Sequence, residues 1–233
     1  METLQTNKSS QRLSEALETV QTAFGLSLGQ HKKQQLLQYF INLHRWNKSI
    51  NLTGIRDDRT LVYKHLGDSL VLGQYLKKEQ KSLLDIGTGP GVPGLVIKIV
   101  RPDLYVVLAE AVRKKCSFLR YISSILRPSD LFIEEKRIGP ESPPLNIPEG
   151  GFDVITSQAT GSLKWLFQIA RPFLSKAGEI IALKGPSVKV EMEEAKLLAE
   201  KEGFFIGIEE NKVPILEHER AVVIFKRQVS GTK

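Results

Sequence analysis

The sequence predicts an α/β fold: a doubly wound, mostly parallel sheet with an antiparallel hairpin at its C-terminal end, preceded by a small helical cap. Three observations support this. The first third carries apolar side chains at helical spacing, short apolar runs then alternate with amphipathic stretches, and no helical stretch separates the last two runs. We place the cap at residues 1–78, the sheet domain at 79–228 and a tail at 229–233, and expect cap and sheet to form one compact unit.

Three helices are expected in the cap. Leucine, valine and phenylalanine recur every three or four residues over 13–24, a second such stretch covers 36–46, and leucines continue the pattern over 61–76. Each stretch has one apolar face, so the three helices are expected to pack together and onto the sheet.

Strands and helices alternate after Lys81. The apolar runs that predict strands are 83–86, 105–109, 131–133, 154–156 and 180–183. The amphipathic stretches that predict helices are 92–100, 116–126, 163–174 and 188–201. This alternation is typical of a parallel sheet with helices on both faces.

The end of the chain departs from the alternation. Two apolar runs, 204–208 and 221–225, are joined only by a loop that contains Pro214. They predict an antiparallel hairpin at the edge of the sheet. A doubly wound sheet that closes on such a hairpin is the layout of the common class I methyltransferase fold, which is Rossmann-like.

Composition narrows the class of protein. Of the 233 residues 41% are hydrophobic and 25% charged, as in ordinary globular proteins, and no apolar run reaches the 18 residues of a membrane span. The single cysteine, Cys116, excludes an intramolecular disulfide and favours a reducing compartment, so we expect a cytoplasmic monomer. The net charge of +7 fits either a polyanionic partner or general solubility. The five cations without an acid over 111–127 favour a nucleic-acid partner.

The stretch "LLDIGTGPGVPGL", residues 83–95, carries the main functional signal. It places Asp85, Gly87, Gly89 and Gly91 at the turn from the first predicted strand into a helix, where ligands bind in open α/β sheets. A literal G-x-G-x-x-G over 89–94 also fits a dinucleotide, but a carboxylate at the mouth of the turn repels a pyrophosphate. The positively charged, phosphate-free S-adenosylmethionine is favoured by the same carboxylate.

A second acid supports this interpretation. Glu110 follows the next predicted strand, 25 residues after Asp85, where an acid accepts hydrogen bonds from ribose hydroxyls. A glycine-rich turn without a ligand and a nicotinamide enzyme remain alternatives. A Walker phosphate loop is excluded, because no Gly-Lys-Ser/Thr follows.

The choice of methyl acceptor is narrowed because residues that other methylation chemistries require are not in the expected places. Cytosine C5 needs a nucleophilic cysteine on a strand-end loop, whereas Cys116 lies inside a predicted helix. Exocyclic amines are usually methylated beside an Asn/Asp-Pro-Pro-aromatic turn, but the sequence over 156–160 reads TSQAT. A ring nitrogen such as N7 of guanine needs neither device, so the sequence permits that acceptor.

Several motifs together resemble the bacterial guanine-N7 methyltransferases of 16S rRNA, the glucose-inhibited division protein B family. They are "RWNKSINLTGIRD", "HLGDSL", "LLDIGTGPGVPGL", "RKKCSFLR", "IALKG" and "ERAVVIFK", in family order between residues 30 and 226. The resemblance implies S-adenosylmethionine as methyl donor and a guanine in a decoding-region loop of 16S rRNA, within the small ribosomal subunit, as acceptor.

The resemblance also implies particular cofactor contacts. It implies Gly87 and Val92 in the glycine loop, Glu110 on the ribose, and Ile138 and Gly139 beside the adenine. Gln158 stands where the family usually has arginine, which puts the contacts there in question. A non-catalytic rRNA-binding, ribosome-assembly factor with this fold is therefore the alternative function.

The remaining candidate site residues are assigned roles from their residue type and their position in the predicted fold. No histidine set suggests a metal. Asn51, His65, Asp68 and Lys184 are expected to position substrate at the mouth of the active site, each against the alternative of an ordinary turn, surface or strand-end residue. Arg113, Lys114, Lys115 and Arg220 are expected to contact RNA phosphates, and the two tryptophans, Trp46 and Trp165, are expected in the core.

Overall fold

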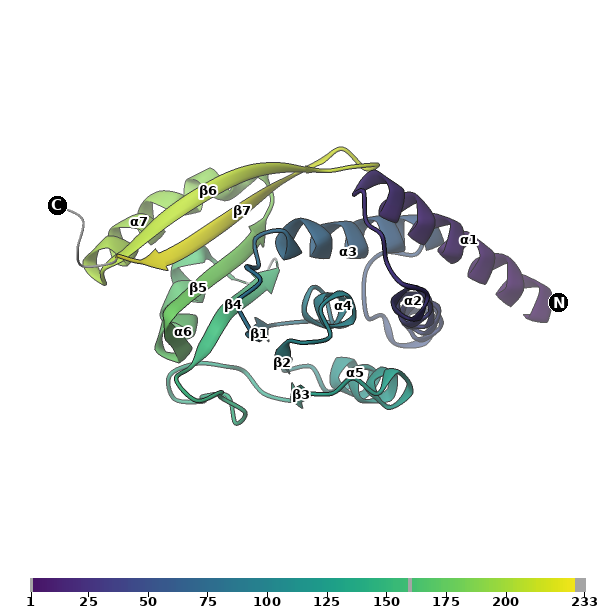
Figure 1. Cartoon of the computed structure of the whole chain (residues 1–233), viewed down its shortest axis with the longest axis horizontal. Coiled ribbons are helices and arrows are strands. Elements are labelled where there is room, and N and C mark those ends of the chain that lie inside the picture. Colours follow the sequence, from purple (N-terminus) through teal and green to yellow (C-terminus); the bar gives the residue numbers. More distant parts are fainter. Residues whose placement is uncertain (1, 159–160, 229–233) are drawn as a thin grey trace.

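The sheet has the order predicted for a doubly wound fold with a terminal hairpin. The computed structural model describes residues 2–158 and 161–228, within which seven strands form one sheet in the order β3-β2-β1-β4-β5-β7-β6 (Figure 1). Strand β1 pairs in parallel with β2 and β4, whereas β7 pairs antiparallel with β5 and β6. The strand order reverses between β1 and β4, which is where such sheets bind ligands. The predicted sheet and hairpin are confirmed.

The predicted elements are present with shifted ends. The strands are β1 (Ser82–Ile86), β2 (Tyr105–Ala109), β3 (Leu131–Glu134), β4 (Phe152–Gln158), β5 (Leu174–Lys184), β6 (Phe204–Val213) and β7 (His218–Arg227). The helices are α1 (Glu2–Ala23), α2 (Gln30–Ile50), α3 (Asp58–Gly73), α4 (Gly94–Val100), α5 (Arg113–Leu126), α6 (Leu163–Ala170) and α7 (Lys189–Lys201). Helix α1 begins well before the predicted start, and the hairpin strands are longer than predicted. The predicted tail, residues 229–233, lies outside the described residues.

Side-chain alternation along the strands builds a core on each face of the sheet. Leu83 and Val106 join one apolar cluster, whereas their neighbours Leu84 and Val107 join the other. Helices α3, α4 and α5 cover the first face, with α2 packed on their outer side, and α6 and α7 cover the second face (Figure 1). Since both faces are buried, the central strands are apolar throughout, as parallel strands are expected to be.

The cap shares its core with the sheet domain. Leu43 of α2 and Leu95 of α4 belong to the same buried cluster. The fully buried Tyr39 of α2 donates its hydroxyl hydrogen to the Pro90 carbonyl of the glycine loop at 3.0 Å. The proposed boundary between residues 78 and 79 therefore separates two segments that share one core.

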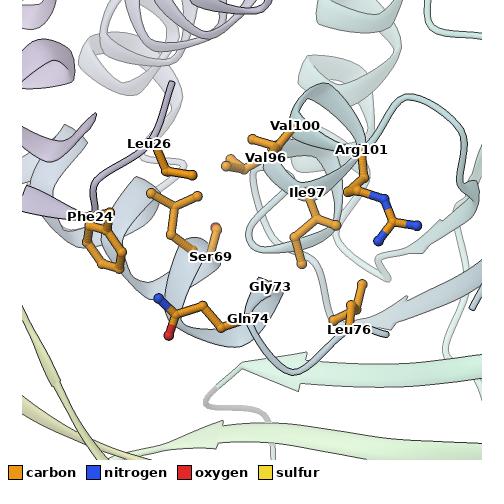
Figure 2. Close-up of a pocket in the computed structure, with 11 residues that line it drawn as sticks. Phe24, Leu26, Ser69, Gly73, Gln74, Leu76, Val96, Ile97, Val100 and Arg101 are labelled. Carbon is orange, nitrogen blue, oxygen red and sulfur yellow. The ribbon is translucent and has the colours of Figure 1, made fainter. Parts of the chain in front are cut away.

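A small apolar cavity marks the contact between the cap and α4. It has a volume of about 190 Å³ (Figure 2). Phe24 and Leu26 approach it from the segment between α1 and α2, Gly73 from the end of α3, and Val96 and Ile97 from α4. A Cβ atom placed on Gly73 would meet no atom within 4 Å, so this contact is not fully packed.

Candidate cofactor and substrate site

The glycine loop turns the chain from β1 into α4. Gly87, Gly89 and Gly91 all have positive φ, at 73°, 61° and 101°. Side chains with a Cβ atom rarely adopt this conformation, so the repeated glycines allow the sharp turn. The loop lies at the carboxyl end of β1, at the point where the strand order reverses.

Asp85 ties the two ends of this loop together. Its Oδ2 atom accepts hydrogen bonds from the Thr88 hydroxyl at 2.6 Å and from the Gly94 amide at 2.8 Å. The side chain is fully buried, its Oδ1 atom has no hydrogen-bond partner in the described part of the chain, and burial raises its pKa to about 7. In this geometry Asp85 shapes the loop, and its direct contact with a ligand stays a prediction.

Glu110 fastens the loop from the neighbouring strand. It follows β2, and its carboxylate is only 6% exposed. Oε2 accepts a hydrogen bond from the Gly89 amide at 2.9 Å, and Oε1 accepts one from the Val112 amide at 2.8 Å. Each carboxylate oxygen can accept two hydrogen bonds, so Glu110 retains acceptor capacity for a ligand.

A cavity opens beside these residues. Its volume is about 320 Å³, and the predicted residues Gly87, Glu110 and Ile138 line it together with Lys115. The side chains of Ile86 and Ile138 are buried, so the cavity combines an apolar wall with a buried carboxylate. That combination suits a nucleoside, whose base is flat and weakly polar and whose ribose carries hydroxyls.

Trp165 also lines the cavity, so its predicted place in the core is wrong. Trp165 lies at the start of α6 and is 37% exposed. The preceding loop makes room for the ring, because a Cβ atom on Gly161 would lie 2.5 Å from Cε3 of the indole. Trp46, by contrast, packs against the core and lies 5.6 Å from the ring of Phe118.

Asp68 connects helix α3 of the cap to strands β4 and β7 of the sheet. This fully buried side chain of α3 accepts hydrogen bonds from Arg220 of β7, at 2.8 Å from Nε and 3.3 Å from Nη2, and from Gln158 Nε2 of β4 at 2.7 Å. The Arg220 side chain is 16% exposed and directed at Asp68, and its contact with RNA stays a prediction. Residues 159 and 160, which follow Gln158, lie outside the described residues.

His65 lies one turn before Asp68 and is also buried. Neither ring nitrogen has a hydrogen-bond partner in residues 2–158 or 161–228, and burial lowers its pKa to about 4. The imidazole is therefore neutral near pH 7. The alternative of a surface pair formed by His65 and Asp68 is wrong, and a substrate-positioning role stays a prediction.

Lys184 holds the loop that follows β4. Its ammonium donates to the Gly161 carbonyl at 2.6 Å and to Glu191 Oε2 at 3.0 Å, and the side chain is 8% exposed. Glu191 in turn accepts from the Leu163 amide at 2.8 Å. This network supports the position of Trp165, and a contact of Lys184 with substrate stays a prediction.

The remaining predicted residues lie around this edge of the sheet. Arg113 and Lys114 are exposed in the first turn of α5, next to the cavity. Asn51 is exposed, with φ of 49°, and its Oδ1 atom accepts a hydrogen bond from Arg56. Six predicted cofactor residues are not among those that line the cavity: Asp85, Gly89, Gly91, Val92, Gly139 and Gln158. Val92 is buried, and Gly139 forms a bridge with Ser142.

Sequence reasoning missed Trp165, Thr88 and Tyr39. Thr88 had a local signal, since it follows Asp85 by three residues within a turn. Tyr39 had none, because its hydroxyl reaches a carbonyl 51 residues away. Trp165 lies beside apolar neighbours that also suit a core position.

Two features are absent from the described residues. Within the described ranges, no group of three or more His, Cys, Asp or Glu residues is placed to hold a metal ion. No helix in the part of the chain that the structure covers is long and apolar enough to cross a membrane.

Comparisons with known proteins show the family of this chain. The model of a family described as rRNA small subunit methyltransferase G (GidB) matches residues 32–223. The ribosomal RNA small subunit methyltransferase G of Escherichia coli (strain K12 / DH10B) is 34% identical over 204 residues, which cover 87% of this chain and 92% of that protein.

Solved structures show the fold. A SAM dependent methyltransferase from Aquifex aeolicus superposes with a TM-score of 0.52 at 18% identity, over 73% of this chain and 94% of that chain. A ribosomal protein L11 methylase from Lactobacillus delbrueckii subsp. bulgaricus superposes with a TM-score of 0.54 at 13% identity, over 76% of this chain and 81% of that chain. The predicted class I methyltransferase fold is confirmed, and the chain belongs to the rRNA small subunit methyltransferase G family.

Proposed function

We propose that this enzyme uses S-adenosylmethionine to methylate N7 of a specific guanine in 16S rRNA, in the decoding-region loop of the small ribosomal subunit. The observation that carries the proposal is the buried carboxylate of Glu110, which lines a nucleoside-sized cavity and is hydrogen-bonded to the glycine loop. Membership of the family supports rRNA as the substrate.

The residues present fit the cofactor. Glu110 has acceptor capacity for the ribose hydroxyls, and Ile138 and Trp165 offer apolar surface for the adenine. Gly87 lines the cavity without a side chain, so the amino-acid end can approach the backbone of the loop. When bound, S-adenosylmethionine supplies a methyl group made electrophilic by its sulfonium.

The protein side chains are needed to position the acceptor guanine. Guanine N7 has an exposed lone pair and no proton, so no general base is required. Asp68 and the neutral His65 both lie on α3. Asp68 bonds Gln158 at the carboxyl end of β4, which is at the same edge of the sheet as the glycine loop. We assign these residues, with Asn51 and Lys184, to shaping the acceptor side of the site.

Location and assembly form part of the same proposal. We infer a cytoplasmic location, which the proposed ribosomal substrate supports. The single cysteine, Cys116, is buried in α5. We infer a monomer, which sedimentation of the purified protein would test.

The decisive experiment uses small subunits that lack the modification. The protein is incubated with tritiated S-adenosylmethionine, and the rRNA is then reduced and cleaved with aniline, which breaks the chain at N7-methylguanosine. One labelled, aniline-sensitive guanine is expected.

A failure to label would be informative. No label, with S-adenosylmethionine binding intact in calorimetry, would favour the ribosome-assembly factor that Gln158 suggests. Binding of a nicotinamide dinucleotide instead would overturn the cofactor assignment.

A further inference from the structure

We propose that the cap carries a second RNA-binding site, a groove that holds backbone phosphates of 16S rRNA apart from the methylated nucleotide. The inference rests on the proposed function and extends it to a new surface. The groove has a volume of about 530 Å³ between α1, α2 and the start of α3. The cap groove is defined by Lys8, Arg12, His44, Lys48 and Arg56, of which the lysines and arginines are positively charged.

Positive charge in the cap groove is not fully neutralised. Of its two acids, Asp58 is 4% exposed and pairs with Arg12 at 2.8 Å, and Asp57 caps α3 by accepting from the Thr60 amide at 2.7 Å. Lys8 and Lys48 are exposed and have no acidic partner among the described residues. Two ammonium groups are therefore available to an external anion.

The two arginines of the groove are held in place before any ligand binds. Arg56 donates from Nη1 to the Asn47 carbonyl at 2.6 Å and from Nη2 to Asn51 Oδ1 at 2.7 Å. Arg12 is fixed by Asp58. A guanidinium has five N–H donors, so both retain donors for phosphate oxygens and lose less conformational entropy on binding.

His44 lines the groove beside Asp58. Its Nδ1 atom lies 2.8 Å from Asp58 Oδ1, and its Nε2 atom is buried without a hydrogen-bond partner within the described residues. Burial lowers the pKa of His44, so the ring is neutral near pH 7. Because this nitrogen is enclosed, His44 serves as a fixed wall of the groove, and the proposed phosphate contacts come from the lysines and arginines.

The cap groove lies at the same edge of the sheet as the cofactor cavity. Helices α2 and α5 run antiparallel: Gln35 bonds Leu126, Asn42 bonds Tyr121, and Trp46 packs on Phe118. The end of α2, with Lys48, therefore lies beside the first turn of α5, which follows the carboxyl end of β2. A single rRNA surface can therefore contact both the cap groove and the cofactor cavity.

The lining favours nucleic acid over a protein partner. Among the side chains that the structure describes, from Lys8 onward, no apolar one lines the groove, whereas protein interfaces are centred on aromatic and aliphatic anchors. Arginine, lysine and serine are among the side chains that contact nucleic-acid phosphates. The cap groove carries all three, since Ser9 completes its lining.

The test compares two charge-matched double variants of the full chain. K8A/K48A removes the two unpaired ammonium groups of the cap groove, and K196A/K201A removes two exposed lysines from α7, at the opposite end of the molecule (Figure 1). Filter binding measures affinity for 16S rRNA of unmodified small subunits over a salt series. Calorimetry measures the Kd for S-adenosylmethionine, and methyl transfer gives kcat and KM.

K8A/K48A is expected to lower the salt slope of RNA binding by about 1.4 to 1.8, for two lost phosphate contacts. At about 0.15 M salt this corresponds to about 20-fold weaker binding, seen as a higher KM with unchanged kcat and cofactor Kd. An equal loss in K196A/K201A, or no loss in K8A/K48A, would overturn the inference. A wild-type protein that neither binds nor labels rRNA would instead overturn the proposed function.

Discussion

The ion pair between Asp68 and Arg220 offers the strictest test of how the cap is joined to the sheet. D68N keeps the shape of the side chain and removes its charge. Asp68 is fully buried and accepts two hydrogen bonds from Arg220 and one from Gln158. The variant leaves a guanidinium facing a neutral amide in a site from which water is largely excluded.

The cost follows from the burial of both partners. Removing one member of a buried ion pair destabilises a protein by about 3–5 kcal/mol. Arg220 is 16% exposed and regains some hydration, so we expect the lower limit, about 3 kcal/mol. For a chain of this size that lowers Tm by about 6–12 °C.

Urea denaturation of the wild type, D68N, R220Q and the double variant measures this pair directly. The cycle is expected to give a coupling energy of about 2 kcal/mol. D130N is the matched control, because Asp130 is exposed and its positive φ suits asparagine, and its cost should stay within about 0.5 kcal/mol. A D68N cost equal to that of D130N, or a coupling energy below about 0.5 kcal/mol, would refute the reasoning.

Three further predictions concern packing, the cofactor and pH. G73A should raise the free energy of unfolding by about 0.5–1 kcal/mol, whereas G67A in the same helix should lower it by about 1–3 kcal/mol, because its Cβ would lie 2.6 Å from Val213 Cγ1. Denaturation midpoints that move in the same direction would contradict this. W165A should weaken S-adenosylmethionine binding about tenfold in calorimetry, for a lost stacking contact, and an unchanged Kd would exclude that contact. His65 has a lowered pKa of about 4, so the unfolded state binds more protons between about pH 4 and 6.5, and stability falls as pH falls through that window. H65L should remove about 3 kcal/mol of that fall, and a wild-type-like pH profile in H65L would contradict the assignment.

Local patterns predicted the elements well and their ends less well. The strand at 105–109 is found at those residues, because a fully buried strand in a parallel sheet must be apolar throughout. The hairpin strands extend beyond the predicted apolar runs, since β6 and β7 pair along polar residues such as Lys212 and Glu219. Pairing of the backbone does not need apolar side chains, so the pattern could not show it.

Among the candidate site residues, those placed by local pattern were predicted well and those placed by distant contacts were not. Glu110 and Gly87 line the cavity, as a strand-end acid and a turn glycine are expected to do. Arg220 was assigned to RNA from its charge alone, but it lies against Asp68, 152 residues away in the chain. Trp165 was assigned to the core from its neighbours, although its ring lines the cavity. Neither contact has a counterpart in local sequence.

The sequence by itself determined the order of strands and helices, the glycine turn and the acid that follows the second strand. These depend on residue periodicity, backbone conformation and the meeting of parallel strand ends at one edge, all of which are local or topological. Only the tertiary structure decided that Asp85 ties the loop, that Asp68 holds Arg220 and Gln158, and that the cap groove lies beside the first turn of α5. Those outcomes depend on burial and on which distant side chains meet, and a charged residue has the same one-letter code whether it faces solvent or a buried partner.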